Sequence, residues 1–329
     1  MKARWKGFHS CLSSPIRRFL EYKRALGRRY LTEEAALRLL DQFLIDNEIA
    51  SPSHISTELL DRFFVSRPRR RPRSFNHLVG VVERLFRWLV NQGILDRSPV
   101  HTTHRRVTET RRPFLFDRAS AGRLLHAAGQ LSSRPKAPLR GPTYRTIFAL
   151  LYGLGLRVGE VTRLCHGDVD LDQDILSIRC TKFSKDRLVP FGPGTHGLLK
   201  EFLALQTERR GELATDDPFF NFVADRAVHP NTVTQTFHAL IPRLELKIPP
   251  GTSPPRLHDL RHSFAVATLL RWYQMGIAPG QRIHHLATFL GHVNPTSTAV
   301  YLTITEELLD QANTRFEHYA SSFLSEAES

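Results

Sequence analysis

Six residues in four short stretches have the side chains that phosphoryl transfer needs. They are Arg157 in GLGLRVGE, Lys182 in TKFSKDRLVP, His258 and Arg261 in HDLRHSFA, and His292 and Tyr301 in LGHVNPTSTAVY. Two guanidiniums can bind the non-bridging oxygens of a phosphodiester and stay charged at any working pH. A tyrosine hydroxyl can attack phosphorus, a lysine can protonate the departing 5′-oxygen, and histidines can act as bases or hydrogen-bonding groups. These residue types therefore predict attack on a phosphodiester that requires no metal.

The stretch HDLRHSFAVATLL, residues 258–270, has the spacing of an amphipathic helix. Its apolar residues recur at three- and four-residue steps and predict one buried stripe: Leu257, Leu260, Phe264, Ala267 and Leu270. His258 and Arg261 stand three residues apart, so we expect them to share a helix face and point toward the same phosphate. His262 is expected to pack or hydrogen-bond locally.

The same motifs also allow other interpretations. The chain has no GxxxxGK[ST] phosphate loop, and GLGLRVG follows a helical run rather than a strand, so a nucleotide-binding loop is not favoured. No triad of acids indicates a metal site. Lys185 competes with Lys182 for the lysine role, Arg157 could pair with Glu160, and Arg187 could be structural or contact phosphate.

The charge of the chain predicts a polyanionic partner, most simply DNA. The 329 residues carry a formal net charge of +14, of which residues 1–106 contribute +11, residues 107–301 contribute +8 and residues 302–329 contribute −5. The run RPRRRPR, residues 67–73, is expected to be a loop that either contacts phosphates or is simply solvated. The candidate DNA-binding residues are Arg69, Arg70, Arg71, Arg73, Arg105 and Arg106.

Helical patterns and loop signals divide the chain into domains. Residues 1–106 predict a domain of four helices, with Thr32 as the N-cap of the second, and residues 107–113 predict a linker. Residues 114–329 predict a mainly α domain with a small antiparallel β-sheet and a C-terminal tail helix. Its β-hairpin is expected in DILSIRCTKFSKDRLVPFG, with the turn in KFSKD.

The location of the protein is indicated by its cysteines. Three widely separated cysteines without a CxxC pair fit a reducing cytosol, and no apolar run approaches the length of a membrane helix. We expect a cytoplasmic, bacterial, nucleoid-associated protein.

The four motifs, in this order, resemble the tyrosine recombinase (phage integrase) family. Their spacing is similar to that of Xer-type recombinases and transposon-borne integrases, and the resemblance covers most of residues 114–301. Residues 13–106 more weakly resemble the SAM-like core-binding domain of that family. The resemblance places the family's catalytic set on Arg157, Lys182, His258, Arg261, His292 and Tyr301, and it favours Lys182 over Lys185.

The resemblance also implies a mechanism and partners. Tyr301 would form a 3′-phosphotyrosine and free a 5′-hydroxyl, and the 5′-hydroxyl of the partner strand would attack that linkage. No ATP, cofactor or metal would be needed. Four protomers on two double-stranded DNA sites would exchange strands through a Holliday junction. Sister recombinases could supply some of these protomers. The outcome would be integration, excision or transposition of a mobile element. The tail helix, after residue 302, would pack on a neighbouring protomer or fold back on its own domain.

Two rival functions are compatible with the same sequence. A type IB topoisomerase-like enzyme would use the same chemistry as a monomer without choosing a sequence. A non-catalytic DNA-binding or regulatory protein would need only the basic first domain.

Overall fold

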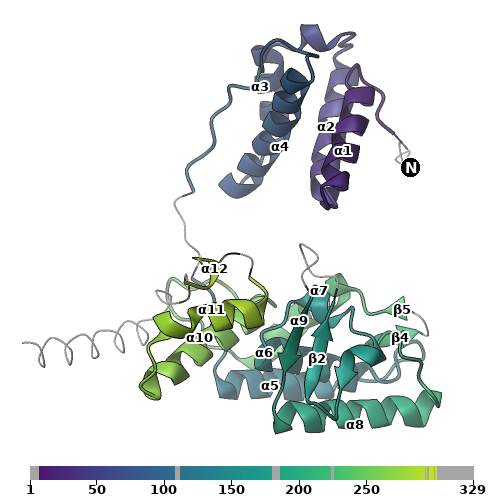
Figure 1. The fold of residues 1–329 in the computed structure, drawn as a ribbon, viewed down its shortest axis with the longest axis vertical. Coiled ribbons are helices and arrows are strands. Elements are labelled where there is room, and N and C mark those ends of the chain that lie inside the picture. Colours follow the sequence, from purple (N-terminus) through teal and green to yellow (C-terminus); the bar gives the residue numbers. More distant parts are fainter. Residues whose placement is uncertain are drawn as a thin grey trace, which may run out of the picture. The chain divides into compact units, whose positions relative to one another are not determined.

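The computed structural model describes residues 7–107, 112–179, 186–223, 226–292, 294, 296–299 and 301. The chain divides into two compact units, residues 1–110 and 111–329 (Figure 1). The first unit has one hydrophobic core and the second has two, and each unit is described by itself.

The first unit is built from four amphipathic helices. They are α1 (Ser13–Ala25), α2 (Leu31–Asp46), α3 (Thr57–Ser66) and α4 (Pro72–Asn91), with a short 3-10 turn at Pro52–His54. Ser56 caps α3, because its side chain accepts a hydrogen bond from the Leu59 N–H. The apolar faces of all four helices meet in one core, in which Phe19 packs edge-on against Tyr30 and Phe43 packs against Phe63.

Two local predictions in this unit were wrong. Thr32 is not an N-cap: α2 begins at Leu31, and Tyr30 occupies the cap position in a left-handed conformation with φ 53°. The buried Tyr30 ring packs on the Phe19 side chain, so core packing rather than a capping hydroxyl sets this helix start. The run 67–73 is also not all loop, because Pro72 and Arg73 form the first turn of α4, where proline suits the first helical position.

The second unit is mainly helical with a small sheet, as predicted. Its helices are α5 (Arg118–Gly129), α6 (Arg140–Gly153), α7 (Val158–Val161), α8 (Pro193–Arg210), α9 (Pro230–Leu240), α10 (Asp259–Gln274), α11 (Pro279–Leu290) and α12 (Thr296–Ala299), with 3-10 turns at His166–Asp168 and Ile241–Leu244. Its strands are β1 (Val169–Asp170), β2 (Ile175–Ile178), β3 (Arg187–Pro190), β4 (Asn221–Val223) and β5 (Arg226–Ala227). The sequence pattern indicated neither α5 nor the β4–β5 pair.

The predicted hairpin is confirmed by the pairing of β2 with β3. The antiparallel sheet has the order β1-β2-β3, and Ile175 pairs with Pro190 while Ile178 pairs with Arg187. The turn predicted in KFSKD, with Lys182 and Lys185, lies outside the described residues except for Asp186. The pairing matters for the site because it fixes the position of Arg187 at the first residue of β3.

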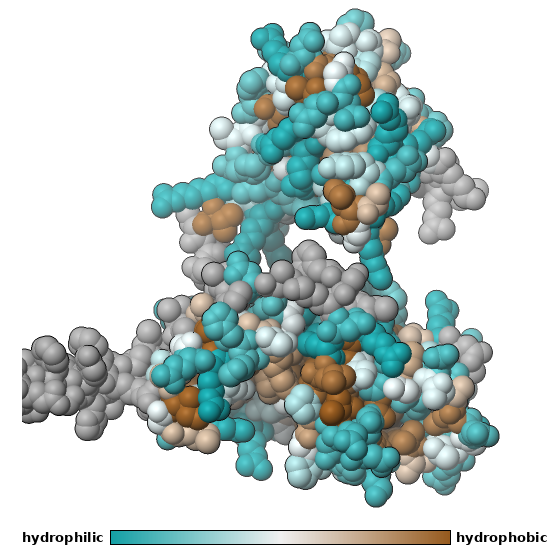
Figure 2. Space-filling view, viewed as in Figure 1, coloured by the Kyte–Doolittle hydropathy of each residue, from teal (hydrophilic) through white to brown (hydrophobic). Residues whose placement is uncertain are grey.

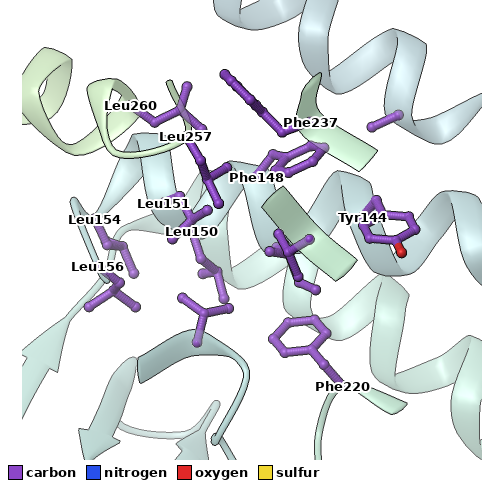
Figure 3. Packing of buried hydrophobic residues seen from close by; sticks show 14 of the residues in the cluster. Tyr144, Phe148, Leu150, Leu151, Leu154, Leu156, Phe220, Phe237, Leu257 and Leu260 are labelled. Atoms are coloured by element: carbon purple, nitrogen blue, oxygen red, sulfur yellow. The ribbon is translucent and has the colours of Figure 1, made fainter. Parts of the chain in front are cut away.

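Aromatic and aliphatic side chains from α6, α9 and α10 form the core that supports the site (Figure 3). Tyr144 and Phe148 of α6 stack with 6.1 Å between ring centroids, and Phe148 meets Phe237 of α9 edge-on at 6.0 Å. Leu257 and Leu260 reach the same cluster from the start of α10. This core therefore anchors the first turn of α10, which carries two of the candidate catalytic residues.

The buried surface of α10 is broader than the predicted stripe. Leu260 is buried as expected, but Ala267 is exposed, and Arg261 and Val266 are buried instead. The reason is that α10 packs against α6 and also against α11, which lies beside it at one end of this unit (Figure 1). Among the residues described, no helix is long and apolar enough to cross a membrane.

Candidate active site

Three arginines from distant parts of the second unit meet at the C-terminal end of α11. The donated hydrogen bonds are Arg187 Nε to Phe289 O (2.8 Å), Arg261 Nη2 to Leu290 O (2.6 Å) and Arg157 Nη2 to Gly291 O (2.9 Å). The last carbonyls of a helix have no partner within the helix and carry partial negative charge. The end of α11 therefore orients three guanidiniums through consecutive backbone oxygens, directly before His292.

Glu160 ties two of these arginines together from the opposite side. Its Oε1 accepts from Arg157 Nη1 (2.7 Å) and Arg187 Nη1 (3.1 Å), and its Oε2 accepts from Arg187 Nη2 (2.9 Å). Burial alone would raise the pKa of this carboxyl, but the hydrogen bonds and charges of Arg187 and Arg157 outweigh it and lower the pKa to about 2. The alternative in which Arg157 pairs with Glu160 is therefore confirmed, and Arg187 has a structural role in this arrangement.

Arg261 is almost completely enclosed and lacks one hydrogen-bond acceptor. It is 1% exposed, and its Nη1 donates to Gly155 O at 2.6 Å. Burial, followed by the charge of Arg157, lowers its pKa to about 10, so it remains a cation at neutral pH. Among the described residues its Nε is buried without a hydrogen-bond partner. An unpaired buried donor costs free energy, so this N–H is suited to an acceptor that arrives with a ligand.

Two glycines allow the backbone to approach this closely. Gly155 has φ +60°, and a Cβ there would lie 2.5 Å from the Phe264 ring and 2.9 Å from Leu290. Gly291 has φ +67°, and a Cβ there would lie 2.7 Å from Nη1 of Arg187. The glycines of GLGLRVGE and LGH therefore serve the contacts of the arginines, which is the physical reason for their place in these motifs.

Four aromatic rings gather beside Arg261. The His258 and His262 rings meet edge-on at 4.7 Å, and His262 meets the Tyr301 ring at 5.4 Å. The His292 ring stacks on Tyr301 at 6.3 Å, and His292 Nδ1 lies 2.7 Å from the Thr298 hydroxyl. Residues from the start of α10, the end of α11 and the segment after α12 thus form one cluster.

The phenol of Tyr301 is buried among polar groups. The residue is 3% exposed, and its hydroxyl oxygen lies 3.0 Å from His262 Nδ1. Burial raises the pKa of Tyr301, whereas the charge of Arg261, a side-chain hydrogen bond with Arg261 and the charge of Arg157 act to lower it. A phenolate formed here would therefore be stabilised by the same cations that can bind a phosphate.

The three histidines of the cluster are neutral at pH 7. Burial is the largest cause in each case, and it lowers the pKa of His258, His262 and His292 to about 4. Nearby cations act in the same direction, with Arg261 affecting all three. Each imidazole therefore offers one donor and one acceptor nitrogen rather than a positive charge.

The structure thus brings five of the six predicted catalytic residues to one place. They are Arg157, His258, Arg261, His292 and Tyr301, whereas Lys182 lies outside the described residues. His262 was underestimated: its contact is to Tyr301, 39 residues away, and not only local. The sequence signal that could have found it is its spacing, because a residue four positions after His258 lies on the same face of α10.

The candidate DNA-binding residues lie in the first unit. Arg70, Arg71, Arg73, Arg105 and Arg106 are exposed, and Arg69 is half-buried. Hydrophilic side chains predominate on the face of this unit seen in Figure 2, with smaller apolar patches between them.

Arg105 differs from the other members of this set. Its guanidinium lies over the Phe75 ring at 3.9 Å, and its Nη1 donates to Arg69 O at 2.9 Å. The backbone N–H of Arg105 also donates to the Asn76 side chain at 2.8 Å. Arg105 therefore fixes the loop that precedes α4 to the segment that follows it.

The geometry of a phenol, two guanidiniums and neutral imidazoles agrees with comparisons with known proteins. Residues 122–307 match the model of the phage integrase family. The chain belongs to this family and is a tyrosine recombinase, an enzyme that cuts and rejoins DNA strands.

Relatives cover nearly the whole chain. The chain is 32% identical to the predicted integrase/recombinase y4rB of Sinorhizobium fredii (strain NBRC 101917 / NGR234), over 94% of this chain and 98% of that protein. It is 27% identical to the tyrosine recombinase XerC of Chlorobaculum tepidum, over 87% of this chain and 84% of that protein.

Solved structures share the fold. The Tn1549 transposon integrase in complex with a circular intermediate DNA has a TM-score of 0.63 at 15% identity, covering 94% of this chain and 100% of that chain. A lambda integrase tetramer bound to a Holliday junction has a TM-score of 0.59 at 18% identity, covering 90% and 78%.

Proposed function

We propose that Tyr301 is the nucleophile with which this recombinase cuts a specific DNA site and forms a 3′-phosphotyrosine. The observation that carries the proposal is the position of the Tyr301 phenol beside Arg261, a buried cation whose Nε still lacks an acceptor. A non-bridging phosphate oxygen would supply that acceptor and bring phosphorus next to the phenol oxygen.

The remaining groups have complementary roles in this proposal. Arg157, whose side chain is 32% exposed, provides the second guanidinium for the phosphate. His258 and His292, which are neutral, provide hydrogen bonds to the phosphate oxygens. Lys182, assigned from its motif, protonates the departing 5′-oxygen. The energy of the cut phosphodiester is retained in the phosphotyrosine linkage. The 5′-hydroxyl of the partner strand can therefore attack that linkage, release Tyr301 and form the new DNA strand.

The partners follow from the same chemistry and from the relatives. Strand exchange needs two double-stranded DNA sites and two active protomers for each round, which favours a tetramer in the synapse, as in the lambda integrase complex with a Holliday junction. We assign phosphate contacts to the arginines of 69–73 and to Arg106, and an indirect role in DNA binding to Arg105, which holds that loop in place. We place the enzyme on the bacterial nucleoid, serving the integration, excision or transposition of a mobile element.

The test is covalent capture on a selected DNA site. Tyr301→Phe protein is first used to select binding duplexes from a random-sequence library. Those duplexes are then nicked a few nucleotides on the 3′ side of the cleavage position, so that the short fragment that bears the new 5′-hydroxyl is lost and the covalent complex accumulates. Wild-type protein should attach to the DNA through Tyr301, as mapped by mass spectrometry of the DNA-linked peptide.

Two variants make the result decisive. Tyr301→Phe should bind the duplex and not attach, whereas Tyr273→Phe, which removes a half-buried phenol of α10, should attach like wild type. Attachment by Tyr301→Phe would refute the assignment. Relaxation of supercoiled DNA that lacks the selected site would instead support a topoisomerase-like enzyme.

A further inference from the structure

His262 makes a direct polar contact with the proposed nucleophile. Its Nδ1 lies 3.0 Å from the Tyr301 hydroxyl oxygen, within hydrogen-bond distance, and the two rings meet edge-on with centroids 5.4 Å apart. The contact joins the first turns of α10 to a residue 39 positions later in the chain. A phenol held only by apolar packing could rotate its hydroxyl freely. Here the hydroxyl is oriented by this contact together with a side-chain hydrogen bond to Arg261.

The His262 ring is itself held in place. On one side it meets the His258 ring edge-on at 4.7 Å with an interplanar angle of 85°. The following turn of its helix is anchored in the core by Val266 and Leu269, which are 3% and 0% exposed. The imidazole is therefore a fixed reference point against which the phenol can be aligned.

The charge state of His262 suits it to accept a hydrogen bond from the Tyr301 hydroxyl. The groups that face it are Arg261 of α10, His258 and Arg256 just before α10, and Tyr301 and His292 from the later segments. Burial, with the charges of Arg256 and Arg261, lowers the pKa of His262 to about 4. A neutral imidazole can accept the phenol proton in a hydrogen bond, and such a weak base is poorly suited to remove that proton completely.

We infer that His262 is a positioning residue for the nucleophile: its Nδ1 accepts the hydrogen bond of the Tyr301 hydroxyl and aims the phenol oxygen at the phosphate held by Arg261. This inference rests on the proposed function of Tyr301. A nucleophile aligned in advance gains rate because little orientational freedom is lost in the transition state. His262 would thus affect the speed of cleavage and not the affinity for DNA.

The experiment compares three substitutions of His262 in the full chain. His262→Phe keeps a planar ring and removes the hydrogen bond. His262→Asn places an amide atom where Nδ1 stands, and His262→Gln places its amide atom at about the distance of Nε2. The DNA is the nicked duplex described above, and the measurements are the single-turnover rate of covalent attachment at saturating protein, the DNA dissociation constant and the melting temperature.

The position of the introduced amide group should decide the rate of covalent attachment. We expect His262→Phe and His262→Gln to bind DNA within about twofold of wild type and to attach at least about tenfold more slowly. We expect His262→Asn to recover most of the rate. If His262→Phe does not fold, the comparison of Asn with Gln still tests the inference, since both are amides and only one reaches the phenol.

Failure of this inference is distinguishable from failure of the proposed function. Attachment of His262→Phe at the wild-type rate, or of His262→Asn as slowly as His262→Gln, would overturn the positioning role while wild-type attachment through Tyr301 still stands. Attachment by Tyr301→Phe would overturn the function itself.

Discussion

The arginines of the two units have opposite environments. In the second unit, Arg261 is 1% exposed and Arg157, Arg187 and Arg261 are fixed by backbone carbonyls at the end of α11. In the first unit, Arg70 and Arg71 stand exposed in the loop before α4. The same residue type is oriented by the fold in one region and surrounded by solvent in the other.

The difference separates catalytic electrostatics from binding electrostatics. A fixed charge in a dry site stabilises a transition state without reorganisation, so its replacement should affect rate strongly. A solvated charge contributes mainly by releasing counterions from DNA, so its replacement should affect affinity and salt dependence. The following substitutions test this division, beginning with the largest expected effect.

Replacement of Arg261 by lysine should affect rate most. Lysine cannot donate to Gly155 O, to Leu290 O and to a phosphate with one rigid fork. We expect covalent attachment to slow by about 100-fold or more, the magnitude typical for loss of a transition-state donor. Arg145→Lys, at an exposed position of α6, is the matched control and should attach normally. A rate for Arg261→Lys within tenfold of wild type would place the catalytic charge elsewhere.

Replacement of Glu160 by glutamine should affect stability most. It leaves Arg157 and Arg187 next to each other without their shared carboxylate, and breaking a buried pair costs about 3–5 kcal/mol. Urea unfolding at pH 7 should show this loss. The control Glu201→Gln removes the exposed partner of Arg145 and should change stability by less than about 1 kcal/mol.

The same carboxyl predicts a pH dependence. The pKa of Glu160 is lowered from 4.5 to about 2 in the folded chain, so its ionised form stabilises the fold above pH 4.5. That contribution is lost as the pH falls from 4.5 toward 2. Glu160→Gln should therefore lose less stability than wild type over this interval, and an identical acid unfolding curve would contradict the arrangement.

Replacement of Arg70 and Arg71 together by alanine should affect DNA affinity and leave the chemistry intact. If each contacts one phosphate, the slope of log affinity against log salt should become shallower by about 1.8. Attachment at saturating protein should keep its wild-type rate. An unchanged salt slope would show that this loop is only solvated.

Replacement of Arg105 by alanine should have the smallest effect, and an indirect one. It removes the stacking on Phe75 and the hydrogen bond to Arg69 O, so the loop before α4 loses an anchor. We expect a loss of DNA affinity of about tenfold or less, together with a lower melting temperature. Arg106→Ala, its exposed neighbour, should lower affinity without the change in melting temperature; equal melting temperatures for the two variants would exclude the anchoring role.

Predictions from the sequence succeeded where the signal was local. The four helices of the first unit and the β2–β3 hairpin follow from apolar spacing and turn residues, which depend on neighbours within a few positions. The start of α2 was missed because the Tyr30 ring packs on Phe19, a contact between helices. The buried surface of α10 was misjudged because two neighbouring helices cover it.

The sequence by itself determined which side chains are available for chemistry, because their types and order are written in four short motifs. Only the tertiary structure decided that the end of α11 orients three arginines and that His262 meets Tyr301. These contacts join residues up to 134 positions apart. They depend on how α7, β3, α10 and α11 pack together through two neighbouring hydrophobic clusters, and no local pattern of residues encodes that packing.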